Sequence, residues 1–84
     1  MTIEATLAER GTTHGSFEDN ARVSQAIKHL LSKNGKDGLP YDMQEALDMI
    51  CLKMSRIVTG KHTVKDHWRD LAGYATLIAN TLED

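Results

Sequence analysis

Apolar residues recur every three or four positions in three long segments of the chain, which is the spacing that one face of an α-helix requires. The first segment follows Ser16, a favourable N-cap with Asp19 three residues on, and stops at Asn34 and Gly35. Its apolar positions form one stripe: Val23, Ala26, Ile27, Leu30 and Leu31. The pattern predicts a helix over 16–34, followed by a loop over the stretch KNGKDGLP.

The second segment begins near Asp42, after Pro40, with Glu45 at the position of a capping box. Its apolar positions run at helical spacing up to Gly60: Met43, Ala46, Leu47, Ile50, Met54, Ile57 and Val58. The third segment, with Thr63 as a candidate cap, runs to about Leu82. Its stripe contains Val64, Trp68, Leu71, Ala72, Ala75, Ile78, Ala79 and Leu82. We expect both stripes to form the core of the fold.

These segments predict an all-α fold, a small bundle of three main helices with a further short helix over 2–9. One proline and no alternation of period two leave little room for strands. We take 1–84 as a single domain. A chain of 84 residues buries only about 60–65% of its unfolded surface, so we expect oligomerisation, as a homodimer or a higher oligomer, to complete the bundle.

Composition narrows the function classes. The net charge is −2 and the ten Lys and Arg residues are scattered, so nucleic acid is an unlikely partner. One cysteine, Cys51, fits a reducing compartment and a small core residue. Because no apolar run approaches the length of a signal peptide core or of a membrane span, we expect a soluble cytoplasmic protein and no membrane partner. The four histidines are too dispersed for a structural zinc site.

The second and third helices each carry a mixed face opposite the apolar stripe. On the second this face contains Glu45, Asp48, Met49, Leu52 and Arg56, and on the third it contains Asp66, Asp70, Gly73, Tyr74 and Leu77. Apolar side chains among so many charges are unusual for a face that only meets water. One interpretation is a subunit interface, in which the apolar groups bury against a second copy and Arg56 pairs with a carboxylate.

The other interpretation is a divalent metal site. Asp66 and Asp70 lie one turn apart, where like charges repel by a few tenths of a kcal/mol. Together with Glu45 and Asp48 they offer the hard oxygen ligands that Mg²⁺ prefers, and the ion would turn this repulsion into attraction. Lys53 and Arg56 would then lie close enough to pair with phosphate groups. The spacing alone supports both interpretations.

The run ALDMICLKMSRIVTGKHTVKDHWRDLAGYATL resembles a domain family of unknown function found in small phage and prophage proteins. The segment ERGTTHGSFEDNARVSQAIK resembles the N-terminal half of that family, so the resemblance covers nearly the whole chain. The family is in turn distantly similar to the all-α, MazG-like nucleotide pyrophosphohydrolases. Those enzymes bind magnesium with acidic pairs on two successive helices and cleave a nucleoside triphosphate into a monophosphate and pyrophosphate.

The resemblance implies roles for particular residues. The stretch EALD would supply the first acidic pair, Glu45 and Asp48, and DHWRD the second, Asp66 and Asp70. Lys53 would bind phosphate, and Tyr74 would offer a surface for a base. The second pair is spaced by four residues and begins with aspartate, where the enzymes have Glu-x-x-Asp.

Two functions follow as hypotheses. In the first, a phage protein of the host cytoplasm binds a nucleotide with Mg²⁺ and acts as a pyrophosphohydrolase, with Glu45 orienting or deprotonating the attacking water. In the second, the chain is a non-catalytic oligomeric phage protein that sequesters a nucleotide signal or binds a host protein. Release of pyrophosphate from nucleotides in the presence of magnesium would distinguish them.

Overall fold

A computed structural model describes residues 2–4 and 16–83, and the regular elements of these residues are all helical. The long helices are α2 (Phe17–Lys33), α3 (Tyr41–Thr59) and α4 (Lys65–Ala79), and the short 3₁₀ helix η1 (Lys36–Gly38) lies between α2 and α3. This confirms the all-α prediction with three main helices. Of the short helix predicted over 2–9, Ile3 and Glu4 are helical, and 5–9 lie outside the described residues.

Both ends of α2 form as the sequence predicts. The Ser16 side chain accepts a hydrogen bond from the Asp19 backbone N–H at 3.1 Å and so satisfies one of the free donors of the first turn. Asn34 ends the helix, and Gly35 follows with a φ of 116°, a left-handed conformation that glycine adopts without strain. The chain reverses at this point and enters η1.

The starts of the other two helices differ from the prediction. Pro40 is the N-cap of α3, and Asp42 lies inside the first turn, where its side chain accepts from the Met43 N–H. The predicted capping box between Asp42 and Glu45 is therefore wrong, because proline supplies a suitable φ for a helix start two residues earlier. Helix α4 begins at Lys65 without a side-chain cap and ends at Ala79, short of Leu82.

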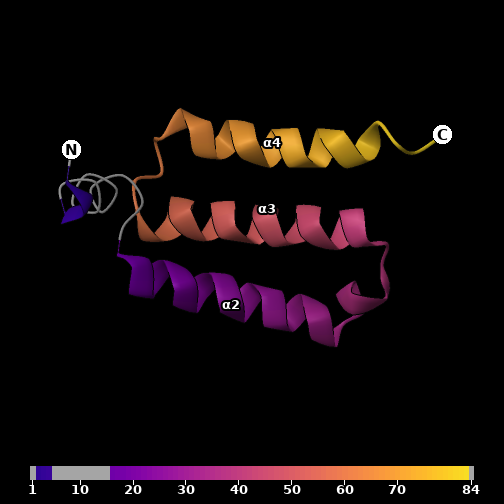
Figure 1. The fold of residues 1–84 in the computed structure, drawn as a ribbon, viewed down its shortest axis with the longest axis horizontal. Helices are drawn as coiled ribbons and strands as arrows, with labels where there is room; N and C mark the ends of the chain where they lie inside the picture. Colours follow the sequence, from indigo (N-terminus) through magenta and orange to yellow (C-terminus); the bar gives the residue numbers. More distant parts are fainter. Residues whose placement is uncertain (1, 5–15, 84) are drawn as a thin grey trace.

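The three long helices lie side by side in one layer with α3 in the middle (Figure 1), and α3 packs against both neighbours. The Cα radius of gyration is 14.4 Å, against about 12 Å for a compact domain of this length. A single layer of helices leaves two broad faces open. Domains normally bury such faces against a second layer.

Apart from Lys36 of η1, the buried residues of the described chain belong to the three long helices. The buried apolar residues of the described chain are Ala46, Cys51 and Ile57, and the buried polar residues are Asn20, Ser24, Lys36, Lys53, Ser55 and His67. The seam between α2 and α3 contains a hydrogen bond between the side chains of Ser55 and Asn20. Cys51 is a buried free thiol, as predicted, and burial raises its pKa. The interior of the layer is thus unusually polar.

The predicted core stripe of α4 is wrong in five positions. Trp68, Ala72, Ala75, Ala79 and Leu82 are exposed. Three predicted positions, Val64, Leu71 and Ile78, do turn away from solvent, and His67, Asp70 and Tyr74 of α4 join them. Since α4 packs chiefly on α3, only a narrow stripe of it is covered, and apolar side chains on either side of that stripe stay in solvent.

Candidate functional site

The seam between α3 and α4 contains a buried lysine in an ion pair. The ammonium nitrogen of Lys53 lies 2.8 Å from an Asp70 carboxylate oxygen, with Lys53 buried and Asp70 half-exposed. The hydrogen bond from Lys53 lowers the pKa of Asp70, and the charges of Lys53, His67 and Arg56 act in the same direction. We name Lys53, Arg56, His67 and Asp70 together the basic seam. Lys53 and Arg56 share one side of α3, as His67 and Asp70 share one side of α4, because each pair is three residues apart.

Arg56 is the group of the basic seam whose hydrogen bonding is incomplete. Its side chain is half-buried, and its Nε atom is buried with no hydrogen-bond partner in the described part of the chain. A buried donor without an acceptor costs free energy, more so when the group is charged. Since Asp70 already accepts from Lys53, the cluster has a surplus of donors and of positive charge. An oxyanion is the type of group that would relieve both.

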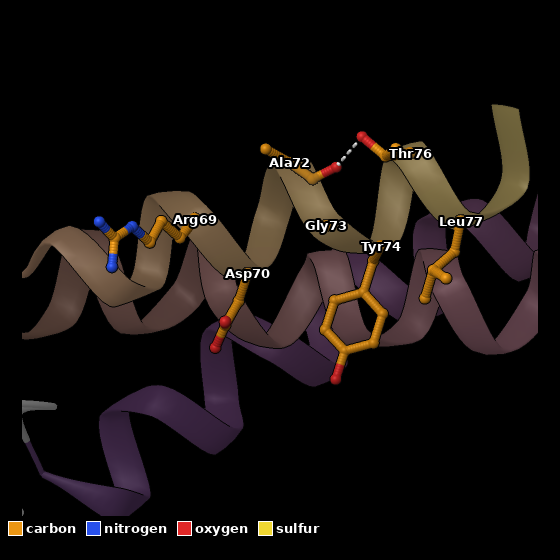
Figure 2. A pocket seen from close by; sticks show the side chains of 7 residues that line it. All are labelled: Arg69, Asp70, Ala72, Gly73, Tyr74, Thr76 and Leu77. Atoms are coloured by element: carbon orange, nitrogen blue, oxygen red, sulfur yellow. Dashed lines mark hydrogen bonds between the residues drawn. The ribbon is translucent and has the colours of Figure 1, made fainter. Parts of the chain in front are cut away.

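Asp70, Tyr74 and Leu77 extend to the same side of α4, whereas Ala72 and Thr76 lie on the opposite side (Figure 2). These residues surround a shallow depression of about 480 Å³ over Gly73. Apart from its chain neighbours and the adjacent backbone of α4, a Cβ atom built at Gly73 would meet no described atom within 4 Å. The rest of the described chain therefore does not require glycine here. The idea that Gly73 admits a ligand or a partner helix stays a prediction.

Glu45 borders a second depression, towards the C-terminal end of α4. Its side chain is exposed, and with Tyr74 and Leu77 it lines this depression of about 280 Å³ between α3 and α4. Tyr74 borders both depressions and is half-buried. The predicted base and the predicted aromatic surface therefore share one groove. The phosphate-binding candidates of the basic seam follow further along the same two helices.

Asp48 has a different environment. Its carboxylate lies 2.5 Å from the Lys36 ammonium nitrogen, so it joins α3 to η1. This hydrogen bond raises the pKa of Lys36. Asp66 is also separate from the basic seam, since its nearest basic partner is Arg69 at 3.9 Å and both side chains are largely exposed. An exposed pair of this kind contributes little to stability.

The four predicted metal ligands do not converge in one chain. Asp48, Asp66 and Asp70 each pair with a different basic side chain: Lys36, Arg69 and Lys53. Among the residues that the structure describes, no group of three or more His, Cys, Asp or Glu side chains could hold a metal ion. The donor set of the single chain therefore does not fit a resident Mg²⁺. The magnesium site stays a prediction for an assembly or for a ligand complex.

Several buried polar residues were not singled out from the sequence. Asn20 and Ser24 stand four apart on α2, and Ser55 meets Asn20 across the seam. His67 stands between Val64 and Leu71 at the spacing of an inward stripe. Helical spacing places these polar residues on one face of each helix. Only the positions of the neighbouring helices show that this face is the inward one.

No helix of the described residues combines the length and apolarity needed to cross a membrane.

The chain belongs to a family defined by a domain of unknown function (DUF6378), whose model matches residues 2–82. No curated protein and no solved structure matches it. The expected membership of a family of unknown function is thereby confirmed. The phage origin and the similarity to MazG-like enzymes stay predictions.

Proposed function

We propose that this member of the DUF6378 family binds a phosphate-bearing small molecule, with a nucleotide as the expected class, at the basic seam. The observation that carries the proposal is the Nε atom of Arg56, which is buried without an acceptor beside the Lys53–Asp70 ion pair. Phosphate oxygens are strong acceptors for arginine and lysine, and charge-assisted bonds of this kind are stronger than neutral ones. The predicted similarity to MazG-like proteins supports a nucleotide as the ligand.

Each residue of the proposed site has a distinct role. Arg56 donates to the phosphate from its incomplete guanidinium group, and Lys53 supplies a second positive charge that Asp70 orients. Tyr74 borders the groove beside Asp70 and offers an aromatic ring against which a base can stack (Figure 2). Asp70 also limits the site, because an anion has to share Lys53 with this carboxylate.

The arrangement supports binding more directly than hydrolysis. Asp48 and Asp70 are engaged by lysines, and the described residues contain no group of three acidic, histidine or cysteine side chains that could hold magnesium. Mg²⁺ commonly reaches a protein together with phosphate groups and needs only one or two carboxylates there. Glu45, in the same groove as Tyr74, is the residue we expect to matter if pyrophosphate is released.

The test is a ligand panel of inorganic phosphate, pyrophosphate, AMP and ATP, each with and without MgCl₂, followed by thermal shift and calorimetry. We expect stabilisation by at least one phosphate compound, which Arg56→Gln abolishes. Arg22→Gln is the matched control, because Arg22 is exposed on α2, pairs with Asp19 and lies outside the basic seam. If no compound shifts the wild-type transition, or if the two variants behave alike, the proposal fails. Pyrophosphate release by the wild type but not by Glu45→Gln would extend it to catalysis.

A non-catalytic role in binding other proteins is the second candidate function. The observation in its favour is the row of large exposed apolar side chains on this chain, among them Leu30, Val58 and Trp68. This role does not compete with the first for residues, since none of these side chains belongs to the basic seam.

A further inference from the structure

Several exposed or half-buried apolar side chains lie on one face of the helix layer. Its middle is the stripe Leu47, Met54 and Val58 of α3, which lies between the residues that face α2 and those that face α4. Leu30 of α2 extends it on one side, and Trp68 and Ala75 of α4 extend it on the other. We name these six residues the apolar face. The mixed face with Glu45, Arg56 and Leu77 lies on the opposite side of α3 and α4.

The solvent-accessible surface of the chain is larger than that of a compact monomer of the same mass. The chain exposes 6177 Å², whereas a compact protein of 9.3 kDa exposes about 5,000 Å². The excess is about 1,200 Å², so two copies that covered it mutually would bury roughly 2,400 Å². That value falls in the range of permanent homodimers. An interface of this area would be large enough for a stable dimer.

The apolar face also has complementary ends. At the end where α3 begins and α4 finishes, a groove of about 290 Å³ lies between the two helices, with Ile50, Ala75 and Ile78 among its walls. At the other end Trp68 projects with 54% of its surface exposed. The hydrogen bond from Trp68 Nε1 to the His62 carbonyl, at 2.8 Å, holds the indole in place. One end therefore offers a fixed aromatic ring and the other an apolar recess.

We propose that a second copy of this chain covers the apolar face and that the two copies place their Trp68 rings in each other's grooves. The two-fold axis would run between the layers and across the helices, so that α3 packs antiparallel on α3 and α4 on α4. Such an axis exchanges the two ends of the face and gives the same contact twice, as an isologous interface requires. The chain segment 5–15 contains three apolar residues, Ala5, Leu7 and Ala8, too few to cover a face of this size.

This arrangement differs from the interface that the sequence suggested, which used the mixed face with Leu77 and Arg56. It leaves the basic seam of each copy on the outside of the assembly. We therefore expect one ligand site per chain, unaffected by association. The dimer does not depend on the proposed function, since ligand binding can be measured on a monomer and dimerisation can be measured without a ligand.

Charge insertion tests the surface. The wild-type chain should sediment at twice its 9.3 kDa mass at micromolar concentrations. Val58→Glu should raise the dimer dissociation constant at least tenfold. Leu77→Glu is the control on the opposite face, because Val58 and Leu77 are 71% and 64% exposed and neither charge should unfold the chain. A monomeric wild type, or dissociation by Leu77→Glu and not by Val58→Glu, would overturn the proposal. So would a monomer that binds neutral lipid vesicles through this face.

Complementation tests the pairing of the ends. Trp68→Glu and Ala75→Lys should each be monomeric by light scattering and helical by circular dichroism. In an equimolar mixture, the new glutamate at position 68 of one copy meets the new lysine at position 75 of the other. The second contact keeps the native Trp68 and Ala75, so a heterodimer should form. Because the chain contains one tryptophan, emission from the mixture reports only the Ala75→Lys copy, and it should shift to shorter wavelength. A mixture no more dimeric than its components would contradict the pairing.

Discussion

Two lysine–aspartate pairs of this fold look alike and differ in what surrounds them. Lys36 pairs with Asp48 where η1 meets α3, and Lys53 pairs with Asp70 between α3 and α4. Both ammonium groups are buried, and both carboxylates are partly exposed. Besides Asp48, the carboxylate of Asp37 acts on Lys36. Besides Lys53, the charges of His67 and Arg56 act on Asp70.

The difference shows that a buried ion pair becomes a binding site through its neighbours. At Lys36 two carboxylates, Asp48 and Asp37, act on the ammonium group, and both disfavour an added anion. At Lys53 the donors and positive charges exceed the acceptors, and one donor, Nε of Arg56, has no partner among the described residues. We therefore assign a structural role to the first pair, which joins the loop to α3, and ligand recognition to the second.

Replacing each lysine by methionine should separate these roles most strongly. Lys53→Met should weaken binding of pyrophosphate roughly 10- to 100-fold, which corresponds to about 1.5–3 kcal/mol for a hydrogen bond to a charged group. Lys36→Met should leave that affinity within twofold. Calorimetry measures both. Because each variant also removes the partner of an aspartate, both should lower the urea midpoint. Equal losses of affinity in the two variants would show that the affinity falls because the fold is destabilised and not because a ligand contact is lost.

Acid should weaken the Lys53–Asp70 pair, because it protonates the Asp70 carboxylate. The folded chain lowers the pKa of Asp70 below its ordinary value of 3.8. The stabilisation from Asp70 is therefore complete above about pH 4 and is lost as the pH falls through the lower folded value. The difference in the free energy of unfolding between wild type and Asp70→Asn should be constant from pH 5 to 7 and shrink towards pH 2. A difference that grows on acidification would reverse the assigned sign.

Alkali should act on the first pair. The hydrogen bond to Asp48 raises the pKa of Lys36 above 10.5, so its stabilisation is complete below that value and is lost as the pH rises through the higher folded value. Comparing wild type with Lys36→Met between pH 8 and 11.5 isolates this contribution from the other titrating groups. The stability difference should stay constant to about pH 10 and then decrease. A flat difference throughout would show that the charge of Lys36 contributes nothing.

The smallest expected effect concerns Gly73, which lies near Asp70 and far from Lys36 along the chain. Gly73→Ala should stabilise the protein by about 0.8–1 kcal/mol, because alanine favours the helix and its methyl group meets no described atom within 4 Å beyond its chain neighbours and the adjacent backbone of α4. The melting temperature should rise by about 4–8 °C. Pyrophosphate affinity should not change, since the phosphate-binding groups lie on α3. Lost affinity with raised stability would place the ligand directly over Gly73.

Local features were predictable from the sequence because their causes are local. Ser16 and Asn34 bound α2 as expected, and α3 ends at Gly60. Lys53, Arg56 and Tyr74 were named as binding residues, and the structure brings Lys53 and Arg56 close to Asp70. It did not bring the four acidic residues together. Their interpretation as ligands rested on helix faces and on family resemblance, and neither shows which basic side chains lie across each seam.

The sequence by itself determined three amphipathic helices, their approximate limits and two mixed faces. Only the tertiary structure decided that α3 lies between α2 and α4 in one layer, so that polar residues such as Lys53, Ser55 and His67 fill the seams while Trp68 and Val58 remain exposed. The physical reason is that the hydrophobic effect is non-directional. An apolar stripe indicates that the helix face is buried. Whether a neighbouring helix or another molecule buries it depends on how the helices pack.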